Sequence, residues 1–574
     1  MGEQAVDIRQ PDRWDNPFDP DMTSAEAQRI LELPLIRELD AGAFPESLSL
    51  ARLVGNETRL IRYQRGDLVV RAGDYGSSAF FVIEGEMAII LPPGLPPEVL
   101  GRSEPRRRPL WNILGQLFNG RLVPESRHPV AGEEDRSTGG SVVRRQEGNE
   151  VRVCLENLDA ILDRHPTVIL GAGELFGEIG ALGRFPRSVS VVARTAAEIL
   201  EIRWQGLRDL RRYDAGFRER LNRLYRERSL KAHLRETPIC KHLPQDVLNH
   251  LEQVVASQVY GEADTSNPFG RTPGLPPNEL LAREPLILEE GRPADSVVLV
   301  QSGFARISQQ FNHGHRTVGF LGRNRIFGLG EVFHRWQQGG KPIGYQYSLR
   351  AIGYVQVLRI SYEDMINHVL PNLPEEMQAP PFTDRHSAFF EQLDRDDVGL
   401  IEFLVEHHFI NGTSAMLINM DRCVRCDDCV LACARAHDNN PRFVRSGPRH
   451  GSFMVASACM HCIDPVCMIG CPTGAIHRSA LKGEVIVNGR TCIGCGTCAG
   501  SCPYGAIRMV EVRDESGAFM RDRATGLPVL RATKCDHCLD QWGGPACQRA
   551  CPHDALLRAN MWDTRALRRW MGWK

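Results

Sequence analysis

Apolar and polar positions alternate over two stretches of the chain, residues 66–90 and residues 284–310. A two-residue period predicts short β-strands. Glycines interrupt the first stretch where such strands must turn, at Gly66, Gly73, Gly76 and Gly85. Short antiparallel strands with frequent turns predict a β-roll, a small barrel of the jelly-roll kind. Because the second stretch repeats the first about 220 residues later, we interpret the two as a duplicated domain.

Between and around these stretches the pattern changes. Apolar residues recur every three or four positions over 206–236, which predicts a helix directly after the first β-roll. Such a helix can join two chains in a homodimer or pack on its own barrel, and the pattern leaves both open. A shorter helical pattern over 24–39 lies in an otherwise loose leader. Residues 92–148 are rich in Pro, Arg, Gly and Ser, which predicts an irregular insertion.

The chain therefore divides into six predicted segments of a multidomain α+β protein. They are a leader (1–40), a first β-roll with the insertion (41–205), a connecting helix (206–236), a second β-roll (237–371), a proline-rich linker with charged helical residues (372–414) and a cysteine-rich domain (415–574).

Composition narrows the function classes. The 574 residues are 42 % hydrophobic and 24 % charged, with a formal net charge of -2, so no global charge draws the chain to nucleic acid or membrane. No stretch approaches the roughly 20 apolar residues of a membrane span, and the first residues carry no secretory signal core. No helix-turn-helix pattern follows either β-roll, which argues against a DNA-reading regulator. We expect a cytoplasmic protein that binds no nucleic acid.

Sixteen of the eighteen cysteines lie in the last third of the chain, in four groups of four. In each group three residues separate the third cysteine from the fourth, and in three groups a proline follows the fourth. The groups are Cys423, Cys426, Cys429 and Cys433; Cys459, Cys462, Cys467 and Cys471; Cys492, Cys495, Cys498 and Cys502; and Cys535, Cys538, Cys547 and Cys551.

This spacing is that of bacterial ferredoxins. A 4Fe–4S cubane needs four thiolates at tetrahedral corners, and a short loop supplies three of them. The fourth cysteine begins the next helical turn and ligates the other cluster of a pair. Structural zinc would instead use well-separated C-x2-C pairs. Four complete groups therefore predict four 4Fe–4S clusters. Cys154 and Cys240 lie outside the groups and are interpreted as core thiols.

The first β-roll carries a second candidate site. "FGEIGAL" at 176–182, followed by Pro186-Arg187-Ser188, resembles the phosphate-binding cassette of cyclic nucleotide-binding domains of the cAMP receptor protein family. The resemblance implies a site for cAMP or cGMP. A turn at Gly177 lets backbone N–H groups approach a phosphate, Arg187 can pair with the phosphate, Glu178 can accept from the ribose 2′-hydroxyl, and Ser188 can add a donor.

The corresponding cassette of the second β-roll is eroded. Gly330-Glu331 in "FGLGEVF" is interpreted as the surviving Gly-Glu pair, and Tyr345 stands where the arginine should be. We therefore expect the second copy to serve as a structural or interface domain.

The cysteine-rich domain is similar to the four-cluster electron-transfer subunits of molybdopterin oxidoreductases, such as the partner subunits of dimethyl sulfoxide reductase and formate dehydrogenase. The matching stretches are "RCVRCDDCVLAC" (422–433), "CMHCIDPVCMIGCPTGAI" (459–476), "CIGCGTCAGSCPYGAIRM" (492–509) and "KCDHCLDQWGGPACQRACPHDAL" (534–556).

The resemblance implies how the groups share clusters: the first pairs with the fourth, and the second with the third. The implied sets are Cys423, Cys426, Cys429 with Cys551; Cys535, Cys538, Cys547 with Cys433; Cys459, Cys462, Cys467 with Cys502; and Cys492, Cys495, Cys498 with Cys471.

Several polar residues lie beside these ligands. Positive charge at Arg422, Arg425, Arg490 and Lys534 should favour the reduced clusters. His461 and His537 lie between ligand cysteines and can donate to cluster sulfur or simply pack.

No catalytic constellation is found in the sequence. The leading hypothesis is an electron-transfer protein with a regulatory nucleotide-binding front end. Its catalytic partner is then a molybdopterin enzyme, a hydrogenase or an NAD(P)H-linked module. The alternative is a redox-responsive regulator in which the clusters sense potential.

Overall fold

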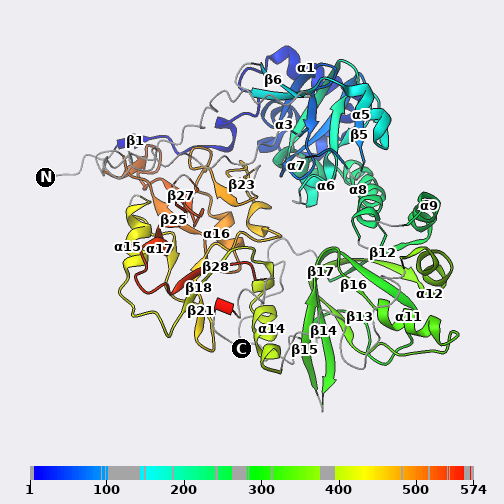
Figure 1. Cartoon of the computed structure of the whole chain (residues 1–574). Coiled ribbons are helices and arrows are strands. Elements are labelled where there is room, and N and C mark those ends of the chain that lie inside the picture. Colours follow the sequence, from blue (N-terminus) through cyan, green and yellow to red (C-terminus); the bar gives the residue numbers. More distant parts are fainter. Residues whose placement is uncertain are drawn as a thin grey trace.

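The computed structural model places three lobes side by side (Figure 1): one built around the first repeat, one around the second, and one holding the cysteine groups. The structure describes residues 6–91, 94–96, 99–100, 142–147, 150–183, 186–237, 239–240, 243–261, 281, 283–311, 314–374, 395–437, 439–479, 483–514, 518–539, 541, 543–561 and 569–570. Most of the predicted insertion and residues 375–394 of the predicted linker lie outside these ranges.

The first lobe is a β-sandwich of two four-stranded sheets, ordered β3-β10-β5-β8 and β2-β11-β4-β9. Alternating apolar residues fill the space between them, and the sandwich core is almost fully buried. The prediction of β-sandwich-type domains is confirmed. The strands are β2 (Thr58–Tyr63), β3 (Leu68–Val70), β4 (Ser78–Glu84), β5 (Met87–Ile90), β8 (Thr167–Leu170), β9 (Leu175–Phe176), β10 (Ser190–Ala193) and β11 (Ala197–Arg203).

Short helices cover this sandwich, and a hairpin lies beside it. The helices α1 (Ser24–Glu32), α2 (Pro34–Arg37) and α3 (Leu50–Glu57) pack over the sheet that contains β4, while α5 (Leu158–Arg164) lies by the other sheet. The hairpin of β6 (Val142–Glu147) and β7 (Glu150–Leu155) falls partly in the segment predicted to be irregular. That prediction is wrong for its last residues.

The leader is not loose. Its strand β1 (Val6–Ile8) pairs in parallel with β26 (Met520–Asp522) of the cysteine-rich lobe, and Figure 1 shows this blue strand beside the orange ones. The Gln10 backbone N–H donates to the Asp522 carboxylate at 2.9 Å. A strand of three residues is too short to give a recognisable alternating pattern. The strand also forms only through pairing with a partner some 500 residues away, so no local signal predicts it.

The predicted connecting helix is two helices, α7 (Trp204–Tyr213) and α8 (Ala215–Glu236). Asp214 between them has extended backbone, and its carboxylate accepts the Phe217 N–H at 2.6 Å. A side-chain cap of this kind begins a new helix and breaks the old one. The apolar spacing continues across the break, which is why the sequence predicts a single helix.

The second lobe repeats the sandwich as a six-stranded sheet in which β14 and β17 are long. Its strands are β12 (Ala256–Tyr260), β13 (Leu286–Leu288), β14 (Ser296–Phe311), β15 (Gly314–Leu321), β16 (Ile326–Phe327) and β17 (Ser348–Ser361). Its helical segments are α9 (Gln245–Val254), α11 (Leu329–Gln337), α12 (Tyr362–Asp364), the π-helical turn η4 (Met365–Val369) and η5 (Leu370–Asn372).

Helix α14 (Arg395–Glu406) joins the second sandwich to the cysteine-rich lobe. Leu400, Ile401 and Leu404 are buried in one core with Phe304 and Phe320 of the sandwich and with residues of the cysteine-rich lobe. The predicted linker therefore ends in a structural helix, because its apolar face has partners on both sides.

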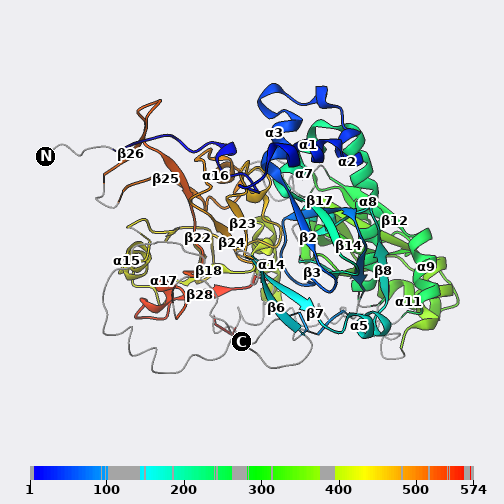
Figure 2. The same ribbon diagram turned by 90° about the horizontal axis from the view of Figure 1, so that it is seen from above.

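The cysteine-rich lobe is built on the sheet β20-β21-β18-β28 and several two-stranded ladders. Figure 2 shows its small strands (yellow to red) on the opposite side of the molecule from the green second sandwich. Its strands are β18 (Ala415–Asn419), β19 (Phe443–Val444), β20 (Arg449–His450), β21 (Phe453–Val455), β22 (Ser457–Ala458), β23 (Ile476–Arg478), β24 (Val485–Val487), β25 (Arg508–Glu511), β27 (Leu530–Thr533) and β28 (Leu556–Ala559). Its main helices are α15 (Asp428–Arg435), α16 (Thr497–Ser501) and α17 (Ala546–Arg549).

Among the helices in the described part of the chain, none combines the length and apolar character that a membrane crossing requires.

Candidate cluster sites and nucleotide cassette

The topology of the cysteine-rich lobe brings the outer two cysteine groups together. Strand β18 precedes the first group and β28 follows the fourth, and the two strands pair antiparallel from Ala415↔Ala559 to Ile418↔Leu556. Helices α15 and α17, which carry Cys429, Cys433 and Cys547, pack in one core. Burial raises the pKa of the Cys429 thiol to about 11, and the neighbouring Cys551 and Cys423 act in the same direction.

The cysteines of the fourth group lie close to one another and to Cys433 of the first group. Burial raises the pKa of the Cys547 thiol to about 12, and its sulfur neighbours are Cys535, Cys433 and Cys538. Buried neutral thiols become thiolate ligands when a bound cation displaces their protons.

The inner two groups line two cavities. One cavity is lined by Cys471, Cys492, Cys495 and Cys498. The other is lined by Cys459, Cys462, Cys467 and Cys502. In each, the fourth cysteine of one group therefore lies with three cysteines of the other.

The sulfurs are met by hydrogen-bond donors from outside the four groups. Backbone N–H groups point at several of them, among them Arg442 at Cys433 (3.1 Å), Ala532 at Cys492 (3.4 Å) and Ala555 at Cys551 (3.3 Å). The Arg558 guanidinium lies 2.9 Å from the Cys535 sulfur, and His437 Nε2 lies 3.5 Å from that of Cys538. Such donors stabilise negatively charged sulfur.

Lys534 supplies the clearest sign that an anion belongs among these groups. Its side chain is 3 % exposed, and its ammonium donates to two backbone carbonyls, those of Val485 and Cys535. Within the described ranges it faces no carboxylate. A buried ammonium without a counter-ion is costly, and a thiolate-ligated iron–sulfur cluster carries the missing negative charge. The donor set therefore fits such clusters.

For His461 and His537 the sequence leaves open sulfur donation and packing, and the contacts in the structure are those of packing. The His461 and His537 rings contact one another at a tilt of 35°, with their centroids 3.7 Å apart; His461 Nδ1 accepts from the Val485 N–H, and His537 hydrogen-bonds Ser414. The sulfur contact is made by His437, which lies outside the ligand spacing. Among the predicted cations, Arg422, Arg425 and Arg490 are exposed, whereas Lys534 is buried.

In the first sandwich, Arg187 is buried at the centre of the predicted cassette. Its guanidinium donates to the carbonyls of Gly177 and, at 2.6 Å, Ser78. A Cβ at Gly76 would come within 2.5 Å of this guanidinium, so the absence of a side chain there makes room for it. Burial lowers the Arg187 pKa to about 10, and Glu201 and Glu178 oppose that shift. No described carboxylate forms an ion pair with it.

Glu178 begins α6 (Glu178–Gly183) and is buried. Burial raises its carboxyl pKa, and Arg228 of α8 opposes the shift from 3.2 Å. The predicted ribose acceptor is thus tied to the connecting helix in this structure. Ser188 is half-buried beside Arg187.

The second sandwich repeats this arrangement with a tyrosine. The Tyr345 hydroxyl donates to the Ser296 carbonyl at 2.7 Å, as Arg187 does to that of Ser78. Gly328, with φ 84°, matches Gly177, with φ 79°. Leu329 then stands in the place of Glu178, and the assignment of Gly330-Glu331 as the surviving pair is wrong by two residues.

Among the described residues, the first sandwich contacts the cysteine-rich lobe near the cassette and along α7. Near the cassette, the Arg478 guanidinium stacks on the Tyr75 ring at 4.8 Å. On α7, Arg208 donates to the backbone carbonyls of Ile469 (3.2 Å) and Cys471 (3.0 Å). Cys471 is a predicted ligand, so helix and cluster site are in direct contact.

Comparison with known families agrees with both candidate sites. The 4Fe-4S dicluster domain family matches residues 451–525, and the cyclic nucleotide-binding domain family matches residues 151–214 and 279–370. The chain is 36 % identical over 154 residues to the electron transport protein HydN of Escherichia coli (strain K12), which covers 25 % of this chain and 85 % of HydN.

A second relative is the arsenate respiratory reductase iron-sulfur subunit ArrB of Shewanella sp. (strain ANA-3), 29 % identical over 192 residues, covering 26 % of this chain and 82 % of ArrB. Among solved structures, the regulatory domain of Toxoplasma gondii PKA with cAMP is 13 % identical and covers 61 % of this chain and 94 % of its own, with a TM-score of 0.19.

Proposed function

We propose that this chain, which belongs to the iron–sulfur electron-transport family of HydN, relays single electrons through four 4Fe–4S clusters under the control of a cyclic nucleotide bound in the first sandwich. The observations that support the electron-transfer part are two cavities, each of which brings three cysteines of one inner group to the fourth cysteine of the other, and the outer groups, where Cys547 and Cys429 each lie near cysteines of both groups. When bound, each cluster accepts and releases one electron at a time.

The side chains support a linear order of the four sets. Arg558 donates to the Cys535 sulfur of one set and to the Cys459 carbonyl of another. The ring contact between His461 and His537 joins the same two ligand loops. The sets that contain Cys459 and Cys535 are therefore the inner pair, and those that contain Cys492 and Cys423 are the ends.

Exposure of the cysteines agrees with this order. Cys426 and Cys495 are exposed and belong to the two end sets, whereas the inner sets hold buried and half-buried cysteines. A relay needs its ends at the surface and its middle insulated from water. Beside Cys426, Val424 and Leu431 are 60 % and 51 % exposed, and this apolar surface is suited to docking a catalytic partner subunit in the cytoplasm.

Arg187 supports the nucleotide part of the proposal. A buried guanidinium that meets carbonyl oxygens, and pairs with no carboxylate among the described residues, is prepared for an anion, and a cyclic phosphate offers one negative charge and two exocyclic oxygens. On nucleotide binding, the Glu178 carboxylate would give up its ion pair with Arg228 and accept a hydrogen bond from the ribose 2′-hydroxyl. Binding thereby loosens the hold of α8 on the cassette.

Iron content tests the relay. Four clusters correspond to about sixteen iron atoms per chain after anaerobic reconstitution, with EPR signals of interacting 4Fe–4S centres on reduction. Cys551→Ser should damage the cluster held mainly by the first group, and Cys154→Ser, outside the four groups, should leave iron content unchanged. A folded, active protein that contains zinc in place of iron refutes the relay, and loss of the fourth group's own cluster in Cys551→Ser refutes the pairing.

A further inference from the structure

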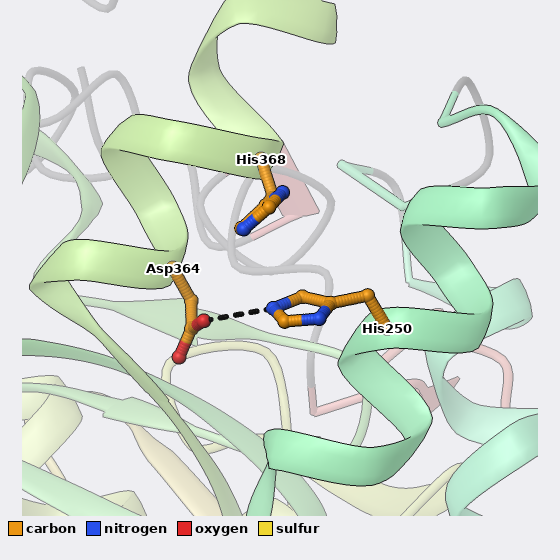
Figure 3. Close-up of side chains that lie close together, drawn as sticks. All are labelled: His250, Asp364 and His368. Atoms are coloured by element: carbon orange, nitrogen blue, oxygen red, sulfur yellow. Dashed lines mark hydrogen bonds and ion pairs between the residues drawn. The ribbon is translucent and has the colours of Figure 1, made fainter.

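Three side chains with metal-binding chemistry meet on the second sandwich, away from the cysteines (Figure 3). His250 extends from α9, Asp364 ends α12, and His368 lies on the π-helical turn η4. His250 Nε2 lies 3.1 Å from Asp364 Oδ1, and the two imidazole rings are 4.1 Å apart. One ligand atom from each residue lies within 4.8 Å of the others.

These separations suit a shared cation. Metal–ligand bonds of about 2.0–2.1 Å place neighbouring ligand atoms roughly 2.8–3.4 Å apart in octahedral or tetrahedral geometry, and the 3.1 Å distance from His250 to Asp364 falls in that range. Asp364 and His368 are four residues apart, a spacing that puts two side chains on one helical face. A small rotation of His368 completes the set.

The neighbouring Ser361 orients the Asp364 carboxylate toward the other two side chains, as hydrogen-bond partners of metal ligands do. Asp364 Oδ2 accepts from the Ser361 hydroxyl at 2.6 Å, and the Asp364 N–H donates to the same hydroxyl at 3.0 Å. Ser361 thus holds one carboxylate oxygen and leaves the other facing His250. Partners of this kind fix ligand geometry in known metal sites. π-helical turns are rare and concentrate at functional sites.

An ion pair between His250 and Asp364 accounts for only part of this arrangement. The His368 imidazole lies beside that of His250 at a tilt of 41°, and no described group hydrogen-bonds its ring nitrogens. Two adjacent imidazolium ions repel, whereas two neutral imidazoles that share a cation do not. The side chains of His250 and Asp364 are 35 % and 22 % exposed, so a cation and its remaining water ligands can enter from solvent.

We propose that His250, Asp364 and His368 bind one divalent first-row transition metal ion. Two imidazoles and one carboxylate favour Zn²⁺ or Fe²⁺ over Mg²⁺ or Ca²⁺, which prefer oxygen donors. The ion joins α9, at the start of the second sandwich, to the helical turn that follows its last strand. The ion therefore links the first and last helical segments of the second sandwich. Because it binds the folded domain, it raises the free energy of unfolding of that domain.

The test uses the full chain with its clusters reconstituted under anaerobic conditions, titrated with zinc chloride. We expect each chain to bind one zinc ion in addition to its iron. X-ray absorption at the zinc edge should show nitrogen and oxygen ligands at about 2.0–2.1 Å and no sulfur ligand at about 2.3 Å. His250→Gln and His368→Gln should each weaken zinc affinity more than about a hundredfold, and Ser361→Ala about ten- to a hundredfold.

His334→Ala is the matched control, because His334 lies half-buried on α11 of the same sandwich. Unchanged iron content in every variant shows that the fold is retained. The proposal is overturned if no extra zinc binds, if its ligands are sulfur, or if the His250 and His368 variants bind zinc as tightly as the control.

Discussion

Two buried cations, Arg187 and Lys534, form no ion pair with a carboxylate of the described residues, and each lies at one of the two proposed anion sites. Arg187 and Lys534 are 7 % and 3 % exposed, and their described hydrogen-bond partners are backbone carbonyls. Carbonyl dipoles offset part of the desolvation of a cation but leave its charge uncompensated. A phosphate at Arg187 and an iron–sulfur cluster near Lys534 would each complete the balance.

Arg187→Ala should lower cyclic-nucleotide affinity about ten- to a hundredfold, equivalent to about 1.5–3 kcal/mol, because it removes a charge-assisted contact. Calorimetry with cAMP and cGMP on the full chain measures it. Tyr345→Phe is the control: it removes only the hydroxyl that bonds Ser296 in the second sandwich. Equal affinity in wild type and Arg187→Ala would contradict the cassette assignment.

Lys534→Met should lower the reduction potentials of the clusters nearest to it, because the ammonium stabilises the reduced, more negative form. The neighbouring thiols of Cys467 and Cys502 feel its charge, and one buried charge at this range corresponds to a change on the order of tens of millivolts. Redox titration followed by EPR reports the shift. Lys534→Arg keeps the charge and should restore most of the potential; identical potentials in Lys534→Met and wild type would exclude this role.

At the scale of elements, the break between α7 and α8 has a testable origin. Asp214→Ala removes the cap that accepts the Phe217 N–H and the side-chain bond to the Asp40 N–H. Loss of an N-cap costs about 0.5–2 kcal/mol. Amide hydrogen exchange at the start of α8 should accelerate accordingly, whereas Asp214→Asn, which keeps an acceptor oxygen, should exchange nearly as wild type does. Unchanged protection in Asp214→Ala would show that the cap carries no stability.

The same scale shows what the sequence can predict. Period-two patterns over 66–90 and 284–310 predict sandwich-type domains because alternate side chains must be buried between sheets. The strand β1 and the structural role of α14 escape prediction, since each depends on a partner surface that comes from elsewhere in the chain. Gly328 shows a third limit: its positive φ, and not the Gly-Glu identity, marks the cassette turn in the second sandwich.

For the candidate sites too, the sequence predicts what a local pattern encodes and misses what depends on distant parts of the chain. Cysteine spacing points to the ligand groups, because a short loop dictates which sulfurs can share a cube. Arg558 on β28 and His437 after α15 contact sulfurs of predicted ligand cysteines, from positions with no local signal in the sequence. His250, Asp364 and His368 were likewise invisible in sequence, because more than a hundred residues separate the first from the other two.

At the scale of the whole molecule, α7 and α8 connect the cassette with the clusters. Arg228 of α8 holds Glu178, and His233 near its end contacts the Gln301 carbonyl of the second sandwich at 2.6 Å. Arg208 of α7 holds the Cys471 carbonyl. A nucleotide that displaces Arg228 thus acts on a helix pair that touches both other lobes. Only unequal binding to two conformations can transmit an effect.

Arg208→Ala should separate binding from control. Because Arg208 contacts Ile469 and Cys471 but lies outside the cassette, nucleotide affinity of the oxidised protein should stay close to that of wild type. The shift in reduction potential that nucleotide causes in the wild type should fall toward zero. Arg212→Ala on the exposed side of α7 is the matched control and should keep the full shift.

Thermodynamic linkage adds a second measurement, since any factor by which nucleotide alters the reduction equilibrium must equal the factor by which reduction alters nucleotide affinity. Calorimetry on oxidised and dithionite-reduced protein should therefore give two affinities in wild type and one in Arg208→Ala; a full potential shift that persists in Arg208→Ala would assign the coupling to the Tyr75–Arg478 contact instead.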